Sequence, residues 1–208
     1  MIVRDALPGE LAEVGEIRVA AYVADGFMSP DSGYAPTLRA LGADGDGQIL
    51  VAIDEGTDEG DGRILGTVTL QFWPHGGEIG VGRDEAEIRA LAVVPGQQGR
   101  GTGTALLNAV IERAGRAGVR RLLLLTQQEM KTAQRMYQRA GFLRLPERDW
   151  TPVEGVVLLA YSLALAADDR LDGKTARRPE SSVSAGRAGR PTGPGPTRTR
   201  PARAARPS

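Results

Sequence analysis

The sequence lacks cysteine altogether and has a single histidine, His75, among its 208 residues. Without a thiol the chain can form no disulfide framework, and it can use neither a catalytic cysteine nor an acyl relay through a thiolate. One histidine and no cysteine also leave too few of the usual zinc ligands. We therefore expect chemistry that needs no metal ion.

Long hydrophobic runs are missing as well. The longest apolar stretch covers residues 156–167, and Tyr161 and Ser162 interrupt it. A helix needs roughly 20 consecutive apolar residues to span a bilayer. The first ten residues contain charged side chains and no apolar signal-peptide core. We expect a cytoplasmic protein that has no membrane partner.

The zero net charge of the chain hides two populations. Residues 173–208 hold nine Lys or Arg and one acid, while the rest holds 17 basic and 25 acidic residues. The basic segment has six prolines and no aromatic residue, so it cannot bury enough apolar surface to balance its chain entropy. We expect one folded domain over residues 1–165 and a disordered tail over residues 166–208. The tail is interpreted as a solubilising extension, with nucleic-acid contact as the alternative.

A glycine-rich turn follows a strand-like segment in the middle of the chain. Residues 87–95 read E-I-R-A-L-A-V-V-P, and residues 97–104 read Q-Q-G-R-G-T-G-T before a run of good helix formers. A helix that begins at such a turn presents unpaired N–H groups and a positive dipole end, which bind phosphate or pyrophosphate. The Lys of a P-loop is missing, as are the third glycine and the acidic residue of a dinucleotide site. A helix start without a ligand is the alternative.

A second motif, A-Q-R-M-Y-Q-R-A-G-F, covers residues 133–142. Ala133, Tyr137 and Gly141 are spaced for one face of a helix, and Gly141 is expected to cap it. Tyr137 could alternatively be a core aromatic. In order and separation, this motif and Gln98-x-x-Gly101-x-Gly103 resemble the two signatures of the GNAT N-acyltransferase superfamily.

The resemblance implies an α/β (α+β) GNAT fold, in which a central mixed, mostly antiparallel sheet is flanked by helices on both faces. Periodicity and turn signals predict a matching element order along the chain. Strands are expected at residues 2–5, 49–53, 63–73, 85–94, 119–126, 142–145 and 156–163, and helices at 8–24, 37–41, 102–117 and 130–140. The segments 26–34 and 74–82 and the region around Trp150 are expected to be loops.

The implied cosubstrate is acetyl-CoA, whose acetyl group would pass to a primary amine by direct attack, without an acyl-enzyme. Backbone groups of Leu91, Ala92 and Val93 would hold the pantetheine arm, and the N–H of Val93 would polarise the thioester carbonyl. The pyrophosphate would bind along the turn, and Ala133 would line the cofactor site. The turn residues are Gln98, Gly99, Arg100, Gly101, Thr102, Gly103 and Thr104.

The resemblance also implies the catalytic groups. Tyr137 would be the general acid, because a phenol stays protonated at neutral pH and can donate to the leaving thiolate. Glu87 aligns with the glutamate that acts as the base, through water, in the histone-acetylating branch. Alternatively Glu87 is a strand-edge charge paired with Arg89. His75 is a second candidate base or a plain loop residue.

Some side chains are left open by the resemblance. Many members carry Asn where this chain has Met130, and Gln127 or Gln128 could replace its hydrogen bond to the pantetheine arm. Arg135 and Arg139 could face either the cofactor or solvent.

Neither motif indicates which acceptor the protein uses. We expect its pocket to draw on Tyr22, Phe27, Met28, Trp73, His75 and Trp150, although both tryptophans could simply cover the core. The acidic domain favours cationic acceptors such as amines, polyamines, aminoglycosides or Lys-bearing peptides. A non-catalytic coenzyme A-binding sensor with the same fold is the alternative function, and monomer and homodimer are equally compatible with the sequence.

Overall fold

The computed structural model describes residues 1–54, 62–74, 77–153 and 155–166. The candidate base His75 and all of the expected tail beyond Ala166 lie outside the described residues. Their roles therefore stay predictions from the sequence.

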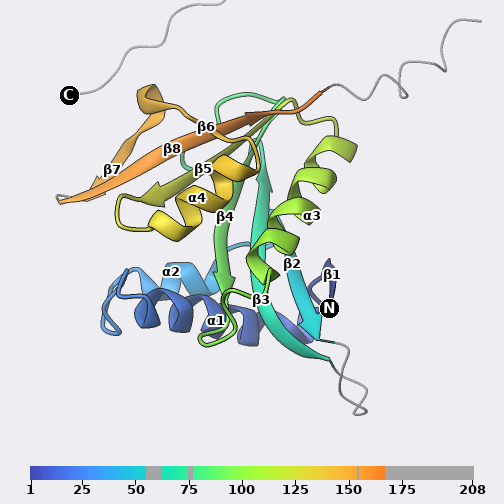
Figure 1. Ribbon diagram of the computed structural model, residues 1–208, viewed down its shortest axis with the longest axis vertical. Coiled ribbons are helices and arrows are strands. Elements are labelled where there is room, and N and C mark those ends of the chain that lie inside the picture. Colours follow the sequence, from blue (N-terminus) through green and yellow to red (C-terminus); the bar gives the residue numbers. More distant parts are fainter. Residues whose placement is uncertain (55–61, 75–76, 154, 167–208) are drawn as a thin grey trace, which may run out of the picture. The chain divides into compact units, whose positions relative to one another are not determined.

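The described residues form one mixed sheet of eight strands in the order β1-β2-β3-β4-β5-β8-β6, with β7 paired to β8 (Figure 1). Only β4 and β5 run parallel, which confirms the predicted mixed, mostly antiparallel sheet. The strands are β1 (Ile2–Asp5), β2 (Gly47–Asp54), β3 (Arg63–Phe72), β4 (Glu85–Val93), β5 (Arg121–Gln127), β6 (Leu143–Arg144), β7 (Trp150–Val153) and β8 (Val156–Ala164).

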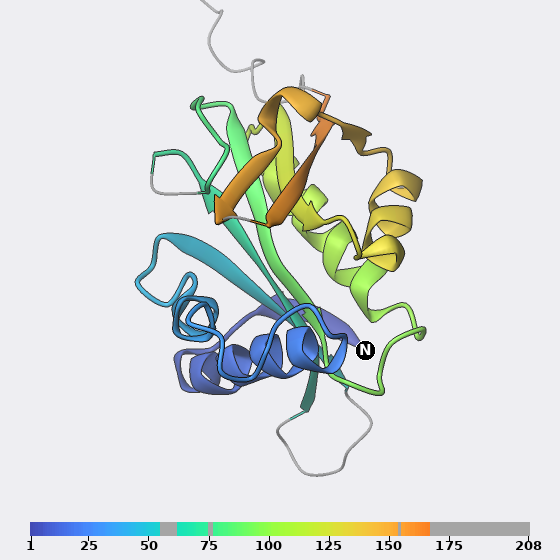
Figure 2. The ribbon, with the colours of Figure 1, turned by 90° about the vertical axis from the view of Figure 1, so that its left-hand side faces the viewer.

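In the described part of the chain, four α-helices cover the two faces of the sheet (Figures 1 and 2). They are α1 (Leu11–Ala24), α2 (Ala35–Ala40), α3 (Thr102–Arg116) and α4 (Lys131–Arg139), and a 3-10 turn at Pro8–Glu10 precedes α1. No helix among residues 1–54, 62–74, 77–153 and 155–166 is both long and apolar enough to cross a bilayer.

The alternation of side chains along the strands creates two cores. In β2, Leu50 and Ala52 pack in the core that also holds Leu106 of α3 and Tyr137 of α4. The intervening Val51 packs in the second core with α1 residues such as Ile17. Because successive strand residues point to opposite faces, one apolar strand serves both helix layers.

The expected loop around Trp150 is wrong, because Trp150–Val153 forms β7. This short strand makes a hairpin with β8, in which Trp150 lies opposite Leu158 and Val153 opposite Val156. Pro152 and Gly155 are typical turn residues, and they hide the hairpin from a sequence pattern. The other elements lie within a few residues of their predicted positions.

The fourth strand changes its geometry at Ala90, whose backbone has φ of 49°. Its register with β3 shifts there, since Thr69 lies opposite Arg89 but Thr67 lies opposite Ala92. Between these two pairs, Ala90 and Leu91 of β4 lie opposite the single residue Val68 of β3, which is the pattern of a β-bulge. The bulge separates the first half of β4 from its last three residues.

The parallel pair formed by β4 and β5 is short. Only Glu85–Ile88 of β4 lie in register with Arg121–Leu124 of β5. Beyond this point β4 continues along β3, whereas β5 continues along β8 (Figure 1). Residues 89–93 of β4 therefore have no register partner on β5, and we call this feature the divergence of β4 and β5.

Candidate active site

The glycine-rich turn leads from β4 directly into α3, as the sequence predicts. Gly99 and Gly101 have φ of 76° and 85°, which side chains other than glycine rarely adopt. A Cβ on either glycine would meet no atom within 4 Å. Both glycines therefore border open space, not packed protein.

The first turn of α3 offers free donors at this open space. Its first helical hydrogen bond runs from Ala105 N–H to Gly101 O, at 2.9 Å, and no side chain caps the helix. The preceding N–H groups have no partner within the helix, and they carry the positive end of its dipole. This end of α3 can bind an anion.

Gln98 and Gly103 shape the turn from within. The Gln98 side chain accepts a hydrogen bond from Gly96 N–H at 2.8 Å. A Cβ on Gly103 would lie 3.3 Å from Sδ of Met136 and 3.7 Å from the side chain of Leu91. Gly103 thus lets α3 pack closely on α4 and β4, which is a different role from leaving room for a ligand.

Tyr137 lies on α4, in the core that also holds Leu106 of α3. It is 7 % exposed, and its ring centroid is 5.9 Å from that of Phe142. Phe142 N–H donates to Tyr137 O and Gly141 N–H to Gln138 O, both at 3.0 Å, so Gly141 caps α4 as predicted. Burial raises the pKa of Tyr137, and the nearby Tyr22 hydroxyl adds to the shift. The phenol therefore remains protonated at neutral pH.

Glu87 is enclosed on the opposite face of the sheet from Val68 and Leu70, and its side chain is only 1 % exposed. Its Oε2 accepts hydrogen bonds from the backbone N–H groups of Glu78, at 2.8 Å, and Ile79, at 3.1 Å. The alternative of a solvated strand-edge charge does not hold, because β4 lies inside the sheet and the carboxylate is buried.

Arg89 lies between two carboxylates. Its guanidinium forms an ion pair with Glu78, and its Nε is 3.8 Å from Oε1 of Glu87. It also donates to Oε1 of Gln71 at 3.4 Å. Burial raises the pKa of Glu78, and the Glu87 carboxylate adds to this shift, although Arg89 opposes it.

Tyr22 of α1 and Tyr34, just before α2, complete this group. Burial raises the pKa of Tyr22 to about 12, with a further contribution from Tyr34, and it also raises the pKa of Tyr34. Arg89 and Glu78 act electrostatically on both phenols. We call Tyr22, Tyr34, Glu78, Glu87 and Arg89 the acceptor-side cluster. Tyr22 links it to Tyr137, because the Tyr22 hydroxyl contributes to the raised pKa of Tyr137.

Sequence reasoning identified only part of this cluster. The sequence predicts Tyr22 and Glu87 at the site and Arg89 only as an alternative partner of Glu87, and it gives no role to Tyr34 or Glu78. Arg89 carried a usable signal, because residues two apart on a strand share a face. Glu78 carried none, since it lies in a Gly-rich loop with no periodicity.

The remaining expected residues are divided between packing and surface positions. Leu91 and Ala133 pack against the core beside α3, and Ala92 packs against α1. Arg135 and Arg139 are exposed on α4. Arg100 and Thr104 are exposed, whereas Thr102 is buried.

The other acceptor-pocket candidates do not form one group. Trp150 packs with Ile79 and Leu123 in a small core, and Trp73 is 37 % exposed with the guanidinium of Arg83 4.7 Å from its ring. Met28 packs beside α2.

The two glutamines lie before α4. Gln127 donates to the carbonyl of Phe27 at 3.4 Å. Gln128 offers its own carbonyl to Nε2 of Gln134 at 3.1 Å. Gln127 therefore joins β5 to the loop after α1.

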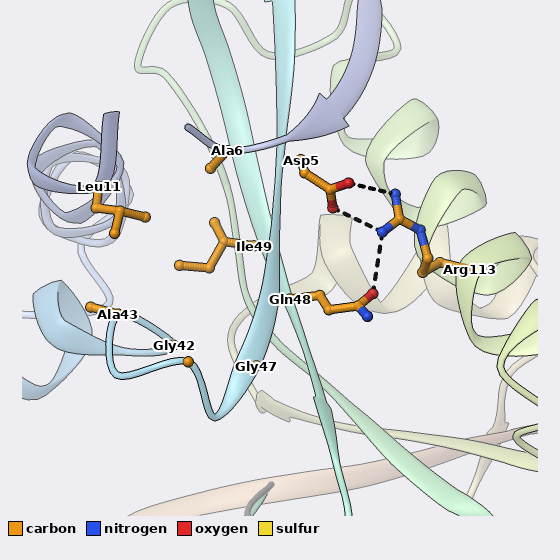
Figure 3. Close-up of a pocket in the computed structure, with 10 residues that line it drawn as sticks. Asp5, Ala6, Leu11, Gly42, Ala43, Gly47, Gln48, Ile49 and Arg113 are labelled. Atoms are coloured by element: carbon orange, nitrogen blue, oxygen red, sulfur yellow. Dashed lines mark hydrogen bonds and ion pairs between the residues drawn. The ribbon is translucent and has the colours of Figure 1, made fainter. Parts of the chain in front are cut away.

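A hollow of about 440 Å³ lies away from these residues, between β1, β2, α3 and the loop after α2 (Figure 3). Its charged groups already bind one another, since Arg113 donates to Oδ1 of Asp5 at 2.8 Å and to Oε1 of Gln48 at 3.3 Å. Most of the remaining lining is glycine, alanine and aliphatic side chains. The hollow therefore offers no free reactive group. The titratable groups described above lie instead at the divergence of β4 and β5, which we take as the candidate site.

The model of the acetyltransferase (GNAT) family matches residues 14–142, which include β4, the glycine-rich turn and the motif on α4. The chain belongs to the GNAT family. The resemblance seen in the sequence is therefore confirmed, and the family is one of acetyltransferases.

Solved structures of GNAT proteins share the fold. An acetyltransferase of the GNAT family from Staphylococcus aureus has a TM-score of 0.60 and 18% identity, covering 79% of this chain and 99% of its own. The yncA protein from Salmonella typhimurium with its cofactor acetyl-CoA has a TM-score of 0.57 and 19% identity, covering 80% and 94%. The ribosomal-protein-S18-alanine N-acetyltransferase from Escherichia coli has a TM-score of 0.59 and 20% identity, covering 81% and 97%.

A search of the curated proteins finds no significant match to this GNAT chain. Within the described part of the chain, no group of three or more His, Asp or Glu side chains is placed to hold a metal ion.

Proposed function

We propose that this GNAT protein is an N-acetyltransferase that moves the acetyl group of acetyl-CoA to a primary amine of a small molecule or peptide. The observation that carries this proposal is the divergence of β4 and β5. Beside it lie the anion-binding end of α3, the protonated phenol of Tyr137 and the acceptor-side cluster. A donor and an acceptor can therefore meet from opposite faces of one sheet.

The donor half suits acetyl-CoA. The open space at Gly99 and Gly101 and the free N–H groups of α3 match a pyrophosphate. The backbone of Leu91–Val93, which has no register partner on β5, is available to the pantetheine arm. The Salmonella typhimurium neighbour was solved with acetyl-CoA, which supports the same donor here.

Tyr137 is proposed to donate a proton to the leaving thiolate. Its raised pKa keeps the proton on the phenol at neutral pH, and a positioned acid of this kind contributes roughly 10²–10⁴-fold to a rate. The chain has no cysteine for an acyl relay, which supports direct attack by the amine. Glu87 and Glu78 lie on either side of Arg89, so both are candidates for the group that receives the proton of the amine.

The test is thiol release from acetyl-CoA across a panel of butylamine, spermidine, kanamycin and a short peptide with a free N-terminal alanine. We expect at least one amine to raise the release rate well above the rate without amine, and the acetylated product to be found by mass spectrometry. The peptide is included because the Escherichia coli neighbour is a ribosomal-protein-alanine N-acetyltransferase.

The alternative function is a coenzyme A-binding sensor without turnover. Calorimetric binding of acetyl-CoA together with no thiol release on any amine would favour the sensor. The acceptor-side cluster favours the enzyme, because a sensor of acetyl-CoA needs no charged residues on the acceptor face.

A further inference from the structure

The two carboxylates beside Arg89 differ in what a substrate can reach. The side chain of Glu78 is 21 % exposed, whereas that of Glu87 is 1 % exposed. One oxygen of Glu87 is already bound by two backbone N–H groups. An incoming amine can thus contact Glu78 directly, whereas Arg89 and the loop separate it from Glu87.

Glu87 also fixes the loop that carries Glu78. Both N–H groups that bind Glu87 belong to residues 78 and 79 of this loop. Gly77 has φ of 94°, and a Cβ there would lie 2.1 Å from Oε2 of Glu87. The backbone therefore wraps around the carboxylate, and the loop can close this tightly only because residue 77 has no side chain.

The next turn of the loop is held separately. Val81 N–H donates to Oε2 of Glu85 at 2.9 Å, and Arg148 donates to the same oxygen at 2.9 Å and to the Ile79 carbonyl at 3.2 Å. Glu85 and Glu87 thus anchor successive parts of one loop. This arrangement allows the contribution of Glu87 to be measured apart from that of Glu85.

The charges of the acceptor-side cluster leave room for one cation. Glu78 and Glu87 form ion pairs with one guanidinium, that of Arg89. Tyr22 and Tyr34 are neutral phenols with raised pKa values, and the buried Arg18 guanidinium acts on these phenols. An alkylammonium beside Glu78 would balance the second negative charge. When Glu78 takes up a proton, Arg89 still has the Glu87 carboxylate beside it.

We propose that Glu78 contacts the ammonium group of the acceptor and accepts its proton, and that Glu87 is a positioning residue that holds Glu78 in place through the loop backbone. This inference rests on the proposed acetyl transfer to an amine. One N–H bond of the ammonium breaks and an O–H bond forms on Glu78, which leaves the nitrogen lone pair free to attack. Glu78 then releases the proton to solvent.

The electrostatics of Glu78 agree with this role. Its pKa is raised by burial and by Glu87, so its carboxylate is a stronger base than an ordinary one, as proton transfer near neutral pH requires. The charged and titratable groups that face it are Arg89 and Glu87 from β4, Tyr22 from α1 and Tyr34 from the loop before α2.

Matched substitutions distinguish the two glutamates. Glu78→Gln is expected to lower kcat/KM for the amine on the order of 10²-fold and to remove the acidic limb of its pH profile, with unchanged affinity for acetyl-CoA. Glu87→Gln keeps an oxygen for the loop N–H groups but loses the charge that raises the pKa of Glu78, so we expect it to retain the acidic limb, moved to lower pH. The reverse pattern, with the limb lost only in Glu87→Gln, would overturn the proposal.

Hydrogen exchange tests the positioning role without turnover. In Glu87→Ala the amides of residues 78 and 79 are expected to exchange about tenfold faster or more, while that of Val81, held by Glu85, stays slow. In Glu78→Gln all three amides should stay slow. Unchanged protection in Glu87→Ala would contradict the anchor.

The outcomes also separate this inference from the proposed function. A wild-type protein that acetylates no amine of the panel refutes the proposed function and this inference together. A wild-type protein that is active, with a Glu78→Gln variant equally active and equally dependent on pH, refutes only the assignment of Glu78.

Discussion

A Cβ atom on Gly77 would stand 2.1 Å from Oε2 of Glu87. Gly77→Ala therefore combines a steric clash with a disfavoured φ, and we expect it to destabilise the fold by roughly 2–4 kcal/mol. It should also lower turnover, because the loop that carries Glu78 must move. Urea unfolding and amine kinetics measure the two effects.

Gly45→Ala is the control for this substitution. Gly45 has φ of 79°, and a Cβ there would meet no atom within 4 Å. Gly45→Ala should therefore lower the free energy of unfolding by only about 1 kcal/mol and leave turnover unchanged. Equal losses at the two glycines would mean that the contact with Glu87 has no energetic weight.

Tyr137→Phe removes the proposed general acid and keeps the ring in the core. We expect kcat to fall by roughly ten- to ten-thousandfold, while the affinity for acetyl-CoA measured by calorimetry changes little. Tyr161→Phe, at another buried tyrosine of the same core, should leave kcat unchanged. A full rate in Tyr137→Phe would remove this phenol from the mechanism.

Gly101→Ala places a methyl group in the space proposed for the pyrophosphate. We expect the KM for acetyl-CoA to rise about tenfold, with a stability loss of about 1 kcal/mol from the positive φ. Gly118 has φ of 77° and the same free surroundings, but it follows the far end of α3. Gly118→Ala should therefore show the stability loss alone, and an equal KM in both variants would argue against pyrophosphate at this turn.

The stability of the protein should fall at alkaline pH because of Tyr22. Its folded pKa is raised to about 12, so above the ordinary phenol pKa of about 10 only the unfolded chain ionises at this residue. The stabilising contribution is complete below pH ~10 and is lost towards pH ~12, at roughly 1.4 kcal/mol per pH unit. Urea unfolding between pH 9 and about 11 gives the free energy of unfolding as a function of pH. This free energy should fall less steeply with pH for Tyr22→Phe than for the wild type, and equal dependence on pH would contradict the assignment to Tyr22.

Arg18 is expected to tolerate no substitution by lysine. It is fully buried, and it donates to Thr69 Oγ1 at 2.6 Å and to the Leu41 carbonyl at 2.7 Å. Burial lowers its pKa to about 10, so the guanidinium is still charged at neutral pH. Lysine cannot make both contacts with one compact ammonium group, so Arg18→Lys should lower the free energy of unfolding by roughly 2–4 kcal/mol.

Arg113→Lys is the matched surface control for Arg18→Lys. Arg113 pairs with the exposed Asp5, so this change should cost less than about 1 kcal/mol. Chemical denaturation of both variants gives the comparison, and similar losses would show that the buried contacts of Arg18 have no special weight.

The local structure of the glycine-rich turn and of α4 could be predicted from the sequence because their residues lie in two contiguous motifs. Gly101 and Tyr137 each belong to a pattern in which spacing alone determines the local structure, and the cap at Gly141 follows from the same pattern. Such patterns depend on backbone geometry over a few residues. Tertiary packing has little influence on them.

The acceptor side could not be predicted in the same way. Tyr34, Glu78 and Arg89 come from segments that meet only when α1 packs on the sheet and the loop after β3 folds back on Glu87. Apart from the spacing that puts Arg89 on the same strand face as Glu87, nothing local in the sequence encodes that meeting. The strand β7 was missed for a related reason, since its pairing with β8 overrides the turn preference of Pro152.

The bulge at Ala90 divides β4 into two parts that natural variation can change separately. Before it, Glu87 and Arg89 act through their side chains; after it, Leu91–Val93 offer backbone groups that are the same for every residue type except proline. If the proposed function holds, side-chain changes around Arg89 can alter the acceptor side, while the backbone that faces acetyl-CoA stays the same and Glu87 keeps its contacts with the loop. On that proposal, one strand can support many acceptor specificities around a constant cosubstrate.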